Sequence, residues 1–194
     1  AIIAEQKAVR DNVGLFDLSH MGELELSGPK ALEFIQKVTT NDASVLEKGQ
    51  IQYSCFTYPD GGIVDDLLVY NLGDRYMLVV NAANIDKDFE WLQQNLIDGA
   101  RLENHSDEIS LLAIQGPNAQ KLLSELTDFN LDDLKYYWAT EAEVAGRNVL
   151  FSRTGYTGED GFELYIPNAE GAHFWKAIIE TGKKYNLTLI GLGA

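Results

Sequence analysis

Two apolar runs flank a tight turn in the stretch Gln50-Ile-Gln-Tyr-Ser-Cys-Phe-Thr-Tyr-Pro-Asp-Gly-Gly-Ile-Val-Asp-Asp-Leu-Leu-Val-Tyr-Asn71. Residues 50–58 and 63–71 have the composition of strands, and Pro59-Asp60-Gly61-Gly62 between them is the strongest hairpin signal in the chain. A third strand is expected over 75–81, followed by an amphipathic helix over 85–96 with Phe89, Leu92 and Leu96 inward. We therefore expect a three-stranded meander with this helix across it.

Outward from this hairpin, strands come in groups of two or three, and each group is followed by one helix. Before it, strands are expected at 15–19 and 23–26, then a helix after Ser27-Gly28-Pro29 with a buried stripe of Ala31, Leu32, Ile35 and Val38. After it, strands are expected at 101–104, 109–115, 136–144, 148–153 and 162–166, and helices at 116–126 and 169–184. This grouping predicts an α+β fold with antiparallel sheets flanked by helices. Two sub-domains are expected, residues 1–45 with 130–194 and residues 46–129.

The composition excludes several classes of function. With 15 Lys and Arg against 30 Asp and Glu, the formal charge is −15, which disfavours binding to nucleic acid or to anionic membranes. One cysteine and three histidines give no cluster at metal-ligand spacing, so we expect no metal site and a reducing compartment. The sequence contains no run of 18 apolar residues, so it predicts no membrane-spanning helix. The compartment expected is the cytoplasm of a bacterium or a mitochondrial matrix.

Adjacent carboxylates interrupt the apolar strand 63–71. Asp65 and Asp66 must point to opposite faces of a strand, so at least one lies on an apolar side. A buried carboxylate needs hydrogen bonds, a charge partner or a proton, and these states are typical of functional sites. The alternative is that both cap the start of the strand beside the Gly61-Gly62 turn.

A glycine-rich segment, Arg153-Thr-Gly-Tyr-Thr-Gly-Glu-Asp-Gly-Phe-Glu163, is the second candidate. Its spacing matches neither a P-loop nor a dinucleotide fingerprint, because no Gly-Lys-Ser/Thr follows and the segment leads into a strand. The glycines predict close backbone turns that aim polar side chains at a ligand, or else plain turns. Tyr53 and Tyr136 alone indicate core or interface aromatics rather than a ligand cage.

Together these segments resemble the aminomethyltransferase (T-protein) family of the glycine cleavage system, which binds folate. The matching pieces occur in the family's order: Gly14-Leu-Phe-Asp-Leu-Ser-His-Met-Gly22, Thr39-Thr-Asn-Asp42, Gly61-Gly-Ile-Val-Asp-Asp-Leu67, Leu112-Ala-Ile-Gln-Gly-Pro117 and Arg153 to Glu163. The resemblance implies transfer of a one-carbon unit from aminomethyl-lipoyl H-protein to tetrahydrofolate, with release of ammonia and formation of 5,10-methylenetetrahydrofolate. It also implies a folate-binding aminomethyltransferase-like fold.

The resemblance assigns roles to individual residues. Asp66 is similar to the family's essential carboxylate near folate N10, and Glu163 to the glutamate that binds the pterin ring. The folate lining implied is Met21, Tyr53, Asn81, Tyr136 and Tyr156, with Asn84 as an alternative to Asn81 and Tyr137 as an alternative to Tyr136.

Other members of the wider family leave a second interpretation open. The chain is then a folate-binding module of a related demethylating enzyme, or a folate-binding protein without catalysis. Ala1 begins inside a helical pattern and Ala194 ends an apolar run, so we expect a fragment that lacks the family's N-terminal segment and C-terminal domain.

Overall fold

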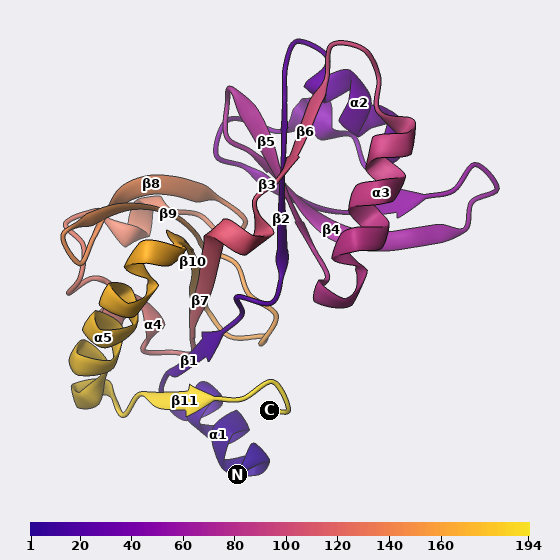
Figure 1. Cartoon of the computed structure of the whole chain (residues 1–194). Coiled ribbons are helices and arrows are strands. Elements are labelled where there is room, and N and C mark those ends of the chain that lie inside the picture. Colours follow the sequence, from indigo (N-terminus) through magenta and orange to yellow (C-terminus); the bar gives the residue numbers. More distant parts are fainter. The chain divides into compact units, whose positions relative to one another are not determined.

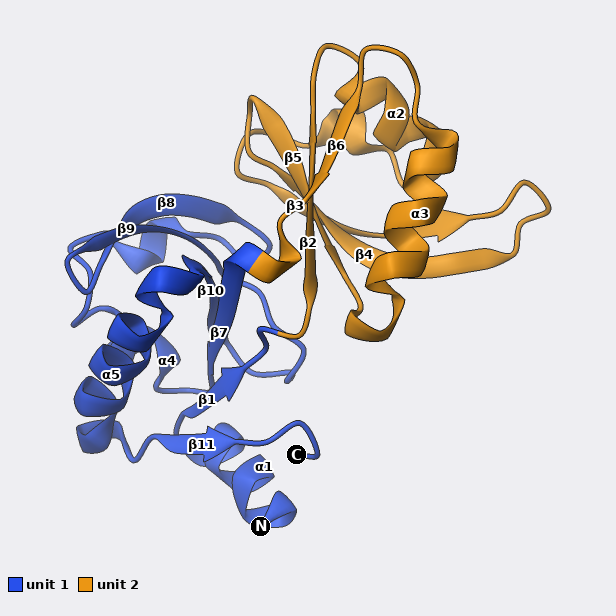
Figure 2. Cartoon of the chain, viewed as in Figure 1, with its two compact units in different colours: residues 1–19, 108–194 blue, residues 20–107 orange.

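The computed structural model describes residues 1–194 and divides into two compact units (Figures 1 and 2). Unit 1 contains Ala1–Ser19 and Glu108–Ala194, and unit 2 contains His20–Asp107. Each unit has its own sheet and its own apolar core, and no residue of one core belongs to the other unit. Short 3-10 turns connect the main elements in both.

Unit 2 is built on a five-stranded antiparallel sheet in the order β3-β4-β5-β2-β6. The strands are β2 (Gly22–Ser27), β3 (Ile51–Thr57), β4 (Ile63–Asn71), β5 (Arg75–Val80) and β6 (Arg101–Asn104). Helices α2 (Ala31–Val38) and α3 (Ile85–Asn95) complete its core. The predicted meander is confirmed as β3-β4-β5.

Unit 1 is built on a six-stranded sheet in the order β11-β1-β7-β10-β9-β8. The strands are β1 (Gly14–Asp17), β7 (Ile109–Gln115), β8 (Ala139–Val144), β9 (Arg147–Ser152), β10 (Gly161–Pro167) and β11 (Thr188–Ile190). Helices α4 (Ala119–Leu123) and α5 (Gly171–Gly182) pack on β10, and α1 (Ile2–Asp11) packs on β1 and β11. Only β1 and β11 pair in parallel.

The predicted sub-domain boundaries at 45 and 130 differ from the structure. Residues 20–45 belong to unit 2 because β2 pairs with β5 and β6, and residues 108–129 belong to unit 1 because β7 pairs with β1 and β10. Strand pairing between segments far apart in the chain set the boundaries, and no shift in composition marks them.

Two predicted helix faces also need correction. In α2 the exposed fraction of Leu32 is 37%, and Phe34 takes its place in the core. In α3 the buried residues are Asp88 and Leu92, whereas Phe89 is half-buried and Leu96 lies beyond the helix. None of the helices combines the length and the apolar composition that crossing a membrane requires.

Candidate functional site

A cavity of about 650 Å³ lies in unit 1 on the face of the sheet opposite the main core. Side chains alternate along a strand, so the core takes Leu112, Ile114, Phe162 and Leu164 and the cavity takes the residues between them. The strand register aligns Phe16, Ala113 and Glu163 in one row across β1, β7 and β10. The small side chain of Ala113 leaves space between the other two. Helix α1 and four residues near the end of the chain, Ile190, Gly191, Leu192 and Ala194, supply further walls.

Glu163 is the buried carboxylate of this cavity, with an exposed fraction of 9%. Its Oε2 accepts a hydrogen bond from Thr154 Oγ1, which lies 2.6 Å from Ser152 Oγ. Burial raises the pKa of Glu163, and the hydrogen bond from Thr154 opposes that rise only in part. A ligand with two adjacent N–H donors would stabilise this carboxylate through a charge-assisted bidentate contact.

The glycine loop, residues 153–161, is fixed to Gln115 at the end of β7. Gln115 is buried; its Nε2 donates to the carbonyl of Thr154 at 2.9 Å, and its Oε1 accepts from Thr157 Oγ1 at 2.9 Å. Gly155 has a φ of +155°, and a Cβ there would lie 2.1 Å from Gln115 Oε1. These contacts hold the loop against β7, and its residues Gly155, Tyr156 and Thr157 line the cavity.

Arg153 holds the other side of the loop with all five of its N–H donors. Its Nε and Nη2 donate to the two oxygens of Asp160 at 2.8 and 2.6 Å. The remaining donors reach the carbonyls of Leu131 and Leu134 and the Oε1 of Gln120. This bidentate pair joins the two ends of the loop, where the chain leaves β9 and where it enters β10.

Three tyrosines accompany this region of unit 1. Tyr156 lines the cavity and is fully exposed. Tyr136 is also exposed, and its ring lies 4.7 Å from that of Tyr137 between centroids. Burial raises the pKa of Tyr137, with smaller effects from Tyr136 and from the charge of Glu163. The exposed ring of Tyr136 and the partly buried ring of Tyr137 lie side by side, so both alternatives for the folate-lining tyrosine stay open.

The second group of predicted residues lies together in unit 2, around Asp66 on β4. Tyr53 Oη donates to Asp66 Oδ2 at 2.8 Å, from the neighbouring strand β3. Asn81 Nδ2 donates to Asp66 Oδ1 at 2.9 Å. The register explains the second contact, since Val80 pairs with Leu67 and Asn81 therefore follows opposite Asp66. The carboxylate is held at both oxygens.

The neighbouring carboxylate is the one on the apolar side. Asp65 is buried, whereas Asp66 is half-buried. The same Asn81 Nδ2 donates to Asp65 Oδ1 at 3.1 Å, so the two carboxylates are not isolated on separate faces as the strand parity suggested. Burial would raise the pKa of Asp65, but hydrogen bonds with Asp88, Asn81, Asn84 and the backbone of Asp66 outweigh it and lower the pKa.

Sequence reasoning missed Asp88 on α3, whose side chain is fully buried. Burial and the proximity of Asp65 raise the pKa of Asp88 to about 7. A signal existed in the sequence, because Asp88 lies three residues after Ile85 and four before Leu92, on one helix face. Met21, another predicted residue, lies half-buried in the turn before β2.

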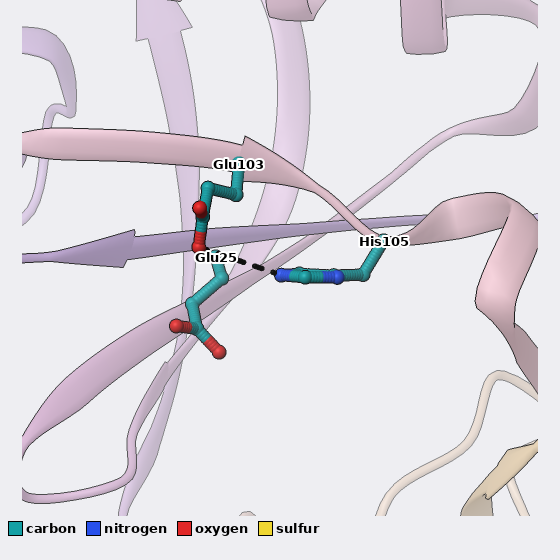
Figure 3. A group of neighbouring side chains, drawn as sticks. All are labelled: Glu25, Glu103 and His105. Atoms are coloured by element: carbon teal, nitrogen blue, oxygen red, sulfur yellow. Dashed lines mark ion pairs between the residues drawn. The ribbon is translucent and has the colours of Figure 1, made fainter.

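A separate cluster is formed by Glu25 on β2, Glu103 on β6 and His105 just after β6 (Figure 3). Glu25 and Glu103 are directly paired across the two strands, and Glu103 Oε2 lies 3.8 Å from His105 Nε2. Arg75 and Arg101 bind these carboxylates at 3.1 and 2.7 Å. The arginines offset the repulsion of a like-charge cross-strand pair, so we assign the cluster to the stabilisation of the sheet.

These features define an α+β protein of two units, one with a cavity around a buried glutamate and one with a doubly hydrogen-bonded aspartate. The chain belongs to the GCVT N-terminal domain family, whose model matches residues 1–194. It is 54% identical to an aminomethyltransferase of Chloroherpeton thalassium and 50% identical to one of Bacillus subtilis, in each case over all of this chain and 54% of the relative.

A solved structure shows the same fold. The glycine cleavage system aminomethyltransferase T from Bartonella henselae matches with a TM-score of 0.88 and 33% identity, over 98% of this chain and 51% of that one. The predicted family and fold class are confirmed. The chain spans about half the length of these relatives.

Proposed function

We propose that this chain is the folate-binding part of an aminomethyltransferase of the glycine cleavage system. The reaction transfers the one-carbon unit from the aminomethyl-lipoyl arm of H-protein to tetrahydrofolate, and yields 5,10-methylenetetrahydrofolate and ammonia. Tetrahydrofolate and lipoylated H-protein are then its partners. The names of the relatives support this assignment, and their bacterial origin favours the cytoplasm as the compartment.

The observation that carries the proposal is Glu163 in its cavity. A pterin is a flat ring system with a donor-rich edge, and it needs apolar walls and one carboxylate acceptor. The cavity offers Phe16, Leu18 and Ile190 as apolar walls, and its volume is in the usual range for small-molecule sites. Tyr156 adds an aromatic face at the rim. These residues fit the group.

Asp66 has a different role in this proposal. The two folate nitrogens form bonds to the methylene carbon while its bonds to the amine nitrogen and to the lipoyl sulfur break, and the two protons lost by folate leave on ammonia and on the dihydrolipoyl thiol. Positive charge develops on the one-carbon unit during this transfer. A carboxylate already held by Tyr53 and Asn81 stabilises that charge without reorganising, which lowers the energy of the transition state more than that of the bound ground state. Asp66 is therefore the catalytic carboxylate, and Met21, Tyr53 and Asn81 are the folate-lining residues proposed in unit 2.

Substitution of Asp66 by Asn in the full-length protein tests the assignment. The change keeps the size and removes the charge, so we expect kcat to fall by on the order of 10²-fold or more while the Kd for tetrahydrofolate changes far less. Asp60→Asn is the matched control, because it removes an exposed charge from the turn of the same hairpin. Turnover is measured as tetrahydrofolate-dependent release of ammonia from aminomethyl-lipoyl H-protein.

Each other result has a definite meaning. Near-normal turnover by Asp66→Asn would remove the carboxylate from the mechanism. Tight folate binding by the wild type without any turnover of H-protein would favour the non-catalytic folate-binding protein, or the module of a demethylating enzyme.

A further inference from the structure

Two buried carboxyl groups meet inside unit 2, one from β4 and one from α3. The side chain of Asp88 is fully buried and interacts with Asp65, whose exposed fraction is 8%. Both residues lie beside the Asp66 cluster but make no contact that the proposed reaction requires. Two ionised carboxylates at this depth would repel one another at low dielectric.

The pattern of donors shows how the repulsion is avoided. Apart from the contact between the two carboxyl groups, Asp65 Oδ2 and both oxygens of Asp88 are buried and have no hydrogen-bond partner in the protein. Lys87 Nζ lies 3.7 Å from Asp88 Oδ1, too far for a hydrogen bond, and donates instead to the carbonyl of Val64 at 2.6 Å. A single proton between the two carboxyls satisfies the pair, because it makes one group a donor and the other an acceptor.

The proton belongs on Asp88. Asp65 accepts from Asn81 Nδ2 and interacts with Asn84 and with the backbone of Asp66, which stabilise its charge. Asp88 has no such donors, and burial disfavours its ionised form. The charged groups that face Asp88 are Asp65 from β4 and Lys87 from its own helix. Helix α3 also packs on β6, whose charged residues Arg101 and Glu103 pair with each other at 2.7 Å, and on β3, which has no charged residue.

We propose that Asp88 is a positioning residue that, as a neutral acid, donates a hydrogen bond to Asp65 and so orients Asn81 and the catalytic carboxylate. The link is geometric, since Asn81 Nδ2 lies 3.1 Å from Asp65 Oδ1 and 2.9 Å from Asp66 Oδ1. With its proton, the pair bears one negative charge and holds Asn81 in place. Without it, a second buried charge disrupts the arrangement. The link to catalysis rests on the proposed role of Asp66.

The charge state is tested first, without any assay of activity. Carbon-13 NMR of the aspartate carboxyls in the 194-residue chain should show one group that titrates near neutral pH. That signal should disappear in Asp88→Asn and persist in Asp66→Asn. If the carboxyl of Asp88 titrates near the ordinary value for an aspartate, the shared proton does not exist and the proposal fails.

Turnover in the full-length protein tests the positioning role. Asp88→Asn retains a donor toward Asp65 and should keep most of kcat. Asp88→Ala removes it, and kcat should fall about tenfold with little change in KM for tetrahydrofolate, the effect of losing one orienting hydrogen bond. The matched control is Asp86→Ala, an exposed aspartate in the same helical turn.

The pH profile separates positioning from a merely structural role. In the wild type kcat should decline as the pH rises through the titration of Asp88, and Asp88→Asn should lack that decline. Suppose that the wild type shows the carboxyl titration by NMR but that kcat of Asp88→Asn depends on pH as in the wild type. This result would overturn the positioning role while leaving the shared proton intact. Absence of turnover in the wild type contradicts the proposed function and with it the link to catalysis.

Discussion

In the proposed function, Glu163 is the residue on which ligand recognition in unit 1 depends. It is buried on the cavity face of β10, and its one neighbouring donor, Thr154 Oγ1, is itself fixed by Ser152. The protein thus keeps an acidic group out of water at a cost in free energy. A ligand that donates to this carboxylate offsets part of that cost on binding.

We expect Glu163→Gln to weaken tetrahydrofolate binding by about 1–3 kcal/mol, because a charge-assisted contact becomes neutral and the amide nitrogen presents a donor to a donor edge. Calorimetric titration of the full-length protein measures the change. Glu159→Gln is the control, since Glu159 lies in the same loop and pairs with Arg10 instead. Equal dissociation constants for Glu163→Gln and wild type would place Glu163 outside the binding site.

The carboxyl pair of unit 2 predicts how stability depends on pH. The folded pKa of Asp88 is raised to about 7, so the native state holds a proton that the unfolded chain releases near the ordinary aspartate pKa of 3.8. Stability from this group is complete below the unfolded pKa and is lost as the pH rises through the folded one, by on the order of a few kcal/mol. The pKa of Asp65 is lowered in the folded state, so its contribution to the free energy of unfolding has the opposite pH dependence and is lost as the pH falls.

Urea unfolding of the chain should therefore show stability that declines between about pH 4 and pH 7 and levels off above that range. Asp88→Asn should flatten this slope, because an amide does not titrate, whereas Asp60→Asn should retain it. A slope that is the same in Asp88→Asn and in wild type would show that other groups cause it, with buried Glu163 as the first to examine.

At the scale of elements, the cavity depends on the fit between the glycine loop and β7. Gly161 begins β10 directly over Gln115, where an added Cβ would lie 2.4 Å from Gln115 Cδ. Gln115 is not free to move aside, because it is buried and hydrogen-bonded to Thr154 and Thr157. The absence of a side chain at Gly161 thus permits the close contact that forms the wall.

We expect Gly161→Ala to destabilise unit 1 by about 1–3 kcal/mol, the usual cost of overpacking, and to weaken ligand binding as well. Gly193→Ala is the matched control, since its Cβ would meet nothing closer than 3.5 Å. Urea denaturation and folate titration measure the two effects. Equal stability of both variants would mean that Gln115 adapts at no cost.

At the scale of the whole molecule, the chain builds two cores rather than one. Every buried residue of the first core lies in unit 1, and every one of the second lies between positions 20 and 107 (Figure 2). A unit with its own core and sheet is expected to unfold with its own free energy.

Matched cavity mutations test this independence. Phe34→Ala in unit 2 and Phe174→Ala in unit 1 each remove a fully buried ring and should each cost about 3–5 kcal/mol. Hydrogen exchange should show the loss of protection confined to the mutated unit in each case. Loss of protection throughout the chain in both variants would show a single cooperative unit instead.

The sequence alone determined the family, the α+β class and the meander around Gly61, because these depend on local turn chemistry, on alternation and on motifs in a fixed order. It also placed one carboxylate of the Asp65–Asp66 pair in an apolar setting. Only the tertiary structure decided the unit boundaries and strand β11, because both result from pairing between distant segments. The tertiary structure alone brought Asp88 beside Asp65, because the packing of a helix on a sheet is not encoded in any single segment. It also aligned Phe16, Ala113 and Glu163 in one row, because the register between strands depends on pairing between distant segments.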